Sequence, residues 1–275
     1  MALTKQQKLE YNESLKEFKS YIEELKKEVI LYKSQMKKNK DAEPYYIIGL
    51  VLNSIRFINT CIEINKLSQH KLRLKSEFYL NLGRKEIYSV FTNMEKVVSM
   101  NFDGSLAENS EYLEKLDLFS PSQRLNFIHG FRAAIEGIVD AYGDQKPSGP
   151  YSKWKWSWPE IYYKLAILSK NLFDFKAYEK ERDINNMHYY VRKEHFNLII
   201  ELCNYAAQEY RTKFDLSTSE TADLRKSVIM LEILKMIYQI TGIRDDLDKT
   251  KTLIESLNNK IDTIESEKTK KKKLK

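Results

Sequence analysis

Glycine and proline are scarce in this chain, with eight Gly and five Pro among 275 residues. Many active sites depend on glycine-rich turns, which let the backbone approach a ligand closely. The chain offers few such turns, and its apolar residues follow a helical periodicity along almost the whole length. The sequence therefore predicts a helical scaffold rather than a fold built around a glycine-rich site.

Cysteine is scarce as well. The two cysteines, Cys61 and Cys203, both lie in apolar stretches of helical pattern. A buried, reduced thiol is the usual state of cysteine in such a position. We therefore expect neither a disulfide framework nor a metal site built from cysteine.

Long hydrophobic runs are also missing. No run reaches the roughly 18 apolar residues that a membrane-spanning helix requires. The first ten residues are polar and lack the apolar core of a secretory signal. These absences predict a cytoplasmic protein.

Common catalytic and metal-binding motifs do not occur in the chain. It has no His-Glu-x-x-His, Cys-x-x-Cys, Gly-x-Ser-x-Gly or phosphate-binding loop. Its four histidines do not form the Glu-x-x-His pairs of a di-iron bundle. We expect no metal, no cofactor and no small-molecule substrate.

Heptad patterns mark both ends of the chain. In segment 1–43, apolar residues alternate four and three apart from Tyr11 to Met36, and segment 217–266 has a similar pattern. This spacing is typical of coiled coils. We expect the two terminal helices to form a stalk. They would pair with each other antiparallel, or each would pair with a second copy of the chain.

The segment between them, 44–216, predicts a central helical bundle. Its first part, 44–67, is apolar on nearly every side and should be the most buried helix. Capping boxes at Ser120, Ser157 and Ser217 predict where three later helices begin. The whole pattern indicates an all-α bundle of roughly seven or eight helices without strands.

A tryptophan-rich loop interrupts the helices at residues 143–159 and holds all three tryptophans of the chain. In an extended backbone, successive side chains point to opposite sides. Three indoles would then share one face and two lysines the other, namely Trp154, Trp156 and Trp158 against Lys153 and Lys155. Such a face suits a protein partner or a membrane interface. Alternatively, the loop folds back and its indoles pack between helix ends.

Lysines accumulate at the end of the sequence. The formal net charge is +7, and six of these excess positive charges lie within residues 268–275, so the rest is nearly neutral. We expect residues 267–275 to form a disordered tail, including Lys270, Lys271, Lys272 and Lys273. The tail either aids solubility or binds nucleic acid or an anionic membrane weakly and in a salt-sensitive way.

One short pattern carries possible catalytic chemistry. Arg182 is followed directly by a polar residue and, six positions on, by His188. This arrangement resembles the Arg-x4–6-His signature of the HEPN family of helical ribonucleases. The resemblance implies that the two residues act together on the RNA 2′-hydroxyl and the scissile phosphate. The alternative is a charge cluster at the start of a helix with a partly buried histidine.

Three kinds of function remain open at this point. The first hypothesis is a non-catalytic interaction or scaffold protein that binds protein partners, or itself, through its coiled-coil ends and the tryptophan-rich loop. The second is a metal-independent HEPN-like ribonuclease that uses Arg182 and His188. A third reading, a nucleic-acid or anionic-membrane binder, depends on the lysine tail.

Overall fold

The computed structural model describes residues 4–100, 106, 109–114, 116–145, 150–180 and 183–273. Ten α-helices and no strand occur in these ranges, which confirms the all-α fold. The two helices beyond the expected number are short or arise where a longer helix breaks. The chain divides into two compact units, one of residues Met1–Ser99 and Leu113–Lys155, the other of Met100–Tyr112 and Trp156–Lys275.

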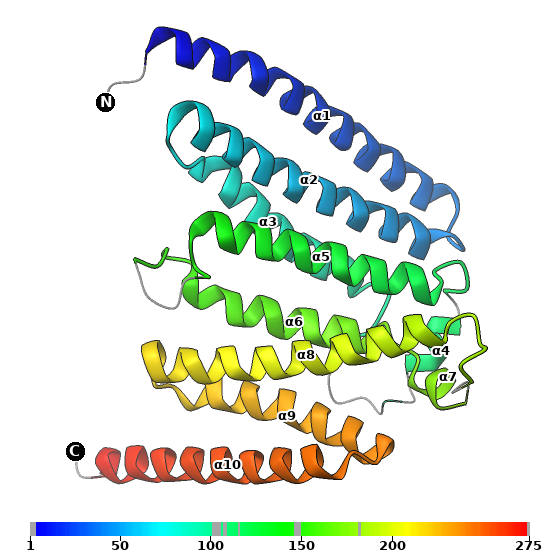
Figure 1. Ribbon diagram of the computed structural model, residues 1–275, viewed down its shortest axis with the longest axis vertical. Coiled ribbons are helices and arrows are strands. Elements are labelled where there is room, and N and C mark those ends of the chain that lie inside the picture. The colour runs from blue at the N-terminus through cyan, green and yellow to red at the C-terminus, as the bar shows by residue number, and fades with distance from the viewer. Residues whose placement is uncertain are drawn as a thin grey trace. The chain divides into compact units, whose positions relative to one another are not determined.

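Unit 1 contains four long helices (Figure 1): α1 (Lys5–Lys38), α2 (Glu43–Leu72), α3 (Glu77–Met94) and α5 (Pro121–Tyr142). Helix α2 packs against the other three and supplies much of the core, as its apolar sequence predicts. It is also the one helix in the described ranges that is long and apolar enough to cross a membrane. Two thirds (67%) of the most apolar 18-residue window of this helix is buried, which is typical of the core helix of a soluble protein.

The heptad seam of α1 is used inside unit 1. Leu15 and Ile22 pack with Ile64 of α2, and Phe57 and Tyr79 cover this cluster. The seam is buried against neighbouring helices of the same unit, so it does not form the stalk expected from the sequence. A heptad pattern specifies an apolar stripe but not which helix covers it.

Unit 2 contains the helices that follow the tryptophan-rich loop: α6 (Trp158–Asn171), α7 (Phe175–Lys180), α8 (Tyr189–Lys213), α9 (Thr221–Thr241) and α10 (Arg244–Lys273). Helix α8 packs against α6 and α9, and α9 packs against α10. The short helix α4 (Asn109–Glu114) is divided in sequence, with its residues up to Tyr112 in unit 2 and those from Leu113 in unit 1.

The expected single helix at the C-terminal end is in fact two. Helix α9 ends at Gly242, which has φ +73°, a left-handed conformation that glycine adopts without steric cost. The chain then reverses, and the seam residues Ile254, Leu257 and Ile261 of α10 are buried in unit 2, where α10 packs on α9. This second seam is therefore also occupied within its own unit.

Of the three predicted capping boxes, only the one at Ser120 forms. Its hydroxyl accepts from the Gln123 amide, and the Gln123 side chain accepts from the Ser120 amide. Ser157 precedes α6 without a side-chain capping bond. Helix α9 begins at Thr221, with no side-chain cap from Glu220.

The two cysteines are fully buried, Cys61 in α2 of unit 1 and Cys203 in α8 of unit 2. Burial raises the pKa of each thiol to about 12. They are reduced core residues, in line with their apolar sequence surroundings.

Candidate functional site

The tryptophan-rich loop is not extended. Lys155–Ser157 forms a 3₁₀ turn, and Trp158 is the first residue of α6. Before the turn, the buried Asp144 carboxylate accepts from the Ser152 amide at 2.7 Å and from its hydroxyl at 2.6 Å. The Lys155 ammonium donates to the Asp144 carbonyl oxygen at 2.8 Å. These bonds fold the loop back on itself, so the expected alternation of side chains is wrong.

The indoles accordingly do not share one exposed face. Trp158 is only 1% exposed, whereas Trp154 and Trp156 are half-buried. The Arg84 guanidinium lies over the Trp154 ring, 3.5 Å from its centroid. This cation–π contact covers one face of the Trp154 indole within unit 1. A recognition role for the loop stays a prediction; among its predicted binding residues Lys153 is exposed, whereas Trp154, Lys155 and Trp156 are half-buried.

Arg182 lies outside the described residues, so its geometry with His188 is not defined. His188 is half-buried and precedes α8, where its amide donates to the Asn186 side chain at 2.8 Å. His195, one heptad further on, is 2% exposed. Its Nε2 lies 3.2 Å from the Ser169 hydroxyl and 3.1 Å from the Ser169 carbonyl oxygen, so it is a core residue.

Three large apolar side chains are exposed around His188. Ile184 is 59% exposed, Met187 84% and Tyr190 66%. They fall within seven residues, in the segment that leads from α7 into α8. We call this set the 184–190 apolar cluster. Single exposed apolar residues are ordinary on protein surfaces, but a concentrated group often marks an interface.

The lysine tail is more ordered than its composition predicts. Helix α10 continues to Lys273, so residues 267–273 are helical rather than disordered. Lys268 pairs with Glu220 at 3.1 Å, and Lys270 is exposed. Basic side chains near a helix C-terminus interact favourably with the helix dipole, which explains the extension. The side chains of Lys271, Lys272 and Lys273 lie outside the described part.

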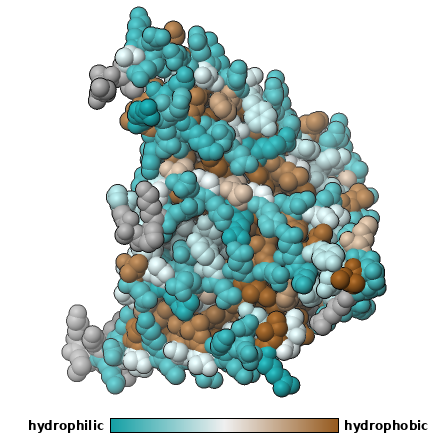
Figure 2. Space-filling model, viewed as in Figure 1, coloured by the Kyte–Doolittle hydropathy of each residue, from teal (hydrophilic) through white to brown (hydrophobic). Residues whose placement is uncertain are grey.

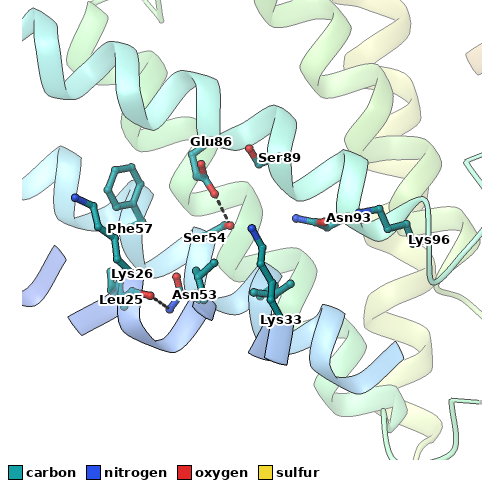
Figure 3. A pocket seen from close by; sticks show the side chains of 12 residues that line it. Leu25, Lys26, Lys33, Asn53, Ser54, Phe57, Glu86, Ser89, Asn93 and Lys96 are labelled. Atoms are coloured by element: carbon teal, nitrogen blue, oxygen red, sulfur yellow. Dashed lines mark hydrogen bonds between the residues drawn. The ribbon is translucent and has the colours of Figure 1, made fainter. Parts of the chain in front are cut away.

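A groove in unit 1 was not anticipated from the sequence. It lies among α1, α2 and α3, and its cavity has a volume of about 430 Å³ (Figure 3). Its apolar lining includes Leu25, Val29 and Leu50. Its polar lining includes three lysines and one carboxylate, namely Lys26, Lys33, Lys96 and Glu86.

Hydrogen bonds fix the α2 side of this groove. The Ser54 hydroxyl donates to Glu86 at 2.5 Å, and the Asn53 amide donates to the Leu25 carbonyl oxygen at 3.1 Å (Figure 3). Asn53 also donates to Glu28 at 3.0 Å. The hydrogen bonds from Asn53 and Arg56 hold the pKa of the Glu28 carboxyl below its usual value. The carboxylates nearest this side of the groove thus already have donors.

The sequence did contain one signal for the groove. Asn53 and Ser54 are adjacent polar residues in the most apolar helix, and both are buried, 3% and 6% exposed. Buried polar residues need partners, so such a pair points to polar groups on neighbouring helices. The lysines could not be found in this way, because charged residues occur along every helix surface.

Unit 2 contains a separate group of ionisable residues that joins three helices. Glu160 of α6 accepts hydrogen bonds from Tyr210 of α8, at 2.5 Å, and from Lys226 of α9. Burial pushes the pKa of Glu160 up, but the bonds from Lys226 and Tyr210 outweigh it and hold that pKa below the usual value. Burial and the Glu160 bond raise the pKa of Tyr210 well above its ordinary range. The residues satisfy one another, which indicates a stabilising cluster.

Over the described ranges, no group of three or more His, Cys, Asp or Glu side chains is placed to hold a metal ion.

The fold and its surfaces define an all-α protein of two helical units. Residues 7–265 match the TP0443 family, and the chain therefore belongs to that family. No curated protein and no solved structure matches the chain.

Proposed function

We propose that the protein is a non-catalytic, cytoplasmic interaction protein that binds a protein partner through the 184–190 apolar cluster. The observation that carries this proposal is the exposure of Ile184, Met187 and Tyr190 within one short segment. On the face drawn in Figure 2, hydrophilic residues cover much of the surface, with apolar residues visible between them. Interfaces are enriched in tyrosine and methionine, and the flexible methionine side chain adapts to the shape of a partner.

The chemistry of the described side chains supports a binding role. His195 is buried in the core, and Glu160, Tyr210 and Lys226 bind one another. The half-exposed Trp156 and the exposed Lys153 can add to a recognition surface. In this proposal the terminal heptad seams stabilise the units, and the partner binds elsewhere.

The test compares two triple variants by quantitative crosslinking and affinity capture of the full chain from its native cell extract. In the first, Ile184, Met187 and Tyr190 are changed to Ser. In the matched control, three similarly exposed residues of α1 are changed to Ser, namely Leu9, Ile30 and Leu31, which are 59%, 69% and 56% exposed. Removing central apolar contacts costs about 2 kcal/mol or more per hot-spot residue.

We expect the first variant to lose the captured partner, and the control to retain it. Self-association is followed in parallel by light scattering, because a second copy of the chain is also a protein partner. Equal retention in both variants, or equal loss, would refute a role for the 184–190 apolar cluster.

The two alternative functions have distinct outcomes. Cleavage of RNA by the purified protein, lost in Arg182→Ala and in His188→Ala, would establish the ribonuclease reading in place of ours. Salt-sensitive binding to nucleic acid or anionic vesicles, lost on deletion of residues 268–275, would support the lysine-tail reading.

A further inference from the structure

The charges around the groove of unit 1 do not balance. Lys26 pairs with Glu23 at 2.7 Å, and Glu86 accepts from Ser54. Lys33 has no ion-pair partner among the residues that the structure describes, and Lys96 bonds only the neutral Asn93 side chain, at 3.2 Å. Two ammonium groups, that of Lys33 in α1 and that of Lys96 in the turn just after α3, thus lie beside one cavity without a counter-charge among the described residues.

We propose that this groove binds a small organic phosphate, whose phosphoryl group lies between Lys33 and Lys96. This inference goes beyond the proposed interaction function and does not depend on it. In Figure 3 the side chains of Lys33 and Asn93 extend from opposite walls into the same space, with Ser89 above them. Together they offer ammonium, amide and hydroxyl donors.

A phosphoryl group matches this set of donors. It carries up to two negative charges and three acceptor oxygens, and charge-assisted hydrogen bonds to lysine are stronger than neutral ones. Glu86 opposes an anion, but its carboxylate lies against α2, where the Ser54 hydroxyl binds it. The lysine charges that remain at the groove therefore favour binding of an anion.

The apolar lining indicates that the ligand is organic. Leu25, Val29 and Leu50 line the groove together with the aromatic ring of Phe57. An inorganic ion would leave these groups in contact with water. The volume of about 430 Å³ lies within the range of roughly 300–1,000 Å³ that is usual for small-molecule sites.

Phenyl phosphate is a suitable probe, because it joins a phosphoryl group to one aromatic ring. Its binding to the full chain is measured by isothermal titration calorimetry at low ionic strength, beside inorganic phosphate and phenol. We expect saturable binding of phenyl phosphate with a Kd of about 1 mM or tighter, and weaker binding of both fragments.

Charge variants locate the site. The double variant Lys33→Gln, Lys96→Gln should lower the affinity for phenyl phosphate about tenfold or more, because it removes two charge-assisted bonds. The matched control, Lys37→Gln with Lys85→Gln, removes the same charge from exposed positions of α1 and α3. The control should change the affinity less than about twofold, because exposed charges act weakly at a distance.

Glu86→Gln supplies a signature of opposite sign. It removes the one carboxylate among the described residues that line the groove and leaves an acceptor for the Ser54 hydroxyl, so we expect severalfold tighter binding. Weaker binding in this variant would contradict an anion site.

The proposal is also overturned if phenyl phosphate does not saturate, if both double variants lose affinity equally, or if phenol binds as well as phenyl phosphate. Preference for an acidic peptide over phenyl phosphate would assign the groove to a protein segment instead. Circular dichroism checks that each variant is folded.

Discussion

Glu160 illustrates how a single side chain can join several helices. Its carboxylate accepts from residues of α8 and α9, and its own helix is α6. The side chain is one third exposed (33%), so solvent screens the ion pair in part. The hydrogen bonds from Lys226 and Tyr210 nevertheless hold the pKa of Glu160 below its usual value, although burial pushes it up.

We predict that Glu160→Gln lowers the free energy of unfolding by about 1–3 kcal/mol near neutral pH, since it weakens two bonds to a charged acceptor. A depressed carboxyl pKa stabilises the fold above the pKa of the unfolded chain, for which the reference value is 4.5, and this contribution is lost as pH falls through the folded-state pKa. The difference between wild type and variant should therefore be constant from about pH 6 to 8 and shrink below about pH 4.5.

Urea denaturation at several pH values measures this difference. Glu63→Gln is the control, because its pair with Lys66 is well exposed, 64% and 52%, and should contribute about 0.5 kcal/mol or less. A pH-independent difference for Glu160→Gln would contradict the role assigned to its charge.

The residues of the candidate sites could be predicted only in part. The sequence singled out the tryptophan-rich loop, but not the packing of Trp154 under Arg84, because these residues are far apart in the chain. Lys33 and Lys96 carry no local signal either. Their significance comes from the cavity that three helices form between them, and pairing of helices is not encoded in the pattern of any one helix.

At the scale of the elements, the sequence was most informative where local chemistry decides. The first heptad helix was expected within segment 1–43, and α1 spans Lys5–Lys38; the Ser120 cap also forms as predicted. The Ser217 box fails because neighbouring groups compete. Thr218 donates to Asp223 at 2.5 Å, and the Glu220 amide donates to the Thr218 hydroxyl at 3.3 Å. Several Ser and Thr residues in succession offer alternative hydrogen bonds to the backbone. A capping-box motif cannot predict which of these hydrogen bonds will form.

Two helical glycines allow the effect of helix propensity on stability to be distinguished from the effect of packing. Gly130 in α5 has no atom within 4 Å of an added Cβ, whereas at Gly83 in α3 that Cβ would lie 2.8 Å from Ile138 Cδ1 and 3.3 Å from Cys61 Cβ. We predict that Gly130→Ala stabilises unit 1 by about 0.5–1 kcal/mol, through lower entropy of the unfolded chain. Gly83→Ala gains the same propensity but should be destabilising, because overpacking costs about 1–3 kcal/mol.

Urea denaturation of the two variants provides the comparison. Each serves as the control of the other, since both exchange glycine for alanine inside a helix. Stabilisation of equal size in both would show that α3 can move away from α2 and α5 without cost.

At the scale of the whole molecule, the expected division into stalk and bundle gives way to two units of helices. The heptad pattern of α1 and that of α10 look alike in the sequence, yet each is buried inside a different unit. Turn chemistry at Gly242 and the chain reversal after α1 decide which neighbour covers each seam. These are tertiary choices, which the periodicity alone does not determine.

Each unit has its own core. We therefore expect a core mutation in one unit to reduce the protection of its backbone amides from hydrogen exchange without affecting the other unit. Leu25→Ala in α1 removes a side chain that is 2% exposed and should cost about 2–5 kcal/mol. Hydrogen exchange measured by mass spectrometry should show faster exchange in α1, α2, α3 and α5, with α8, α9 and α10 unchanged.

Ile261→Ala in α10, where Ile261 is 1% exposed, should give the reverse pattern. Faster exchange across all helices in either variant would show that the chain unfolds as one cooperative body.

The burial of the two cysteines has a practical consequence. Burial raises the pKa of both thiols, which keeps them protonated near neutral pH, and both residues are fully buried in the folded protein. Alkylating reagents and peroxide therefore react only when the surrounding helices separate. Cys61 belongs to unit 1 and Cys203 to unit 2. The natural chain thus carries one buried cysteine in each unit. The rate of alkylation of each cysteine-containing peptide therefore reports how fast that unit opens, without any engineered label.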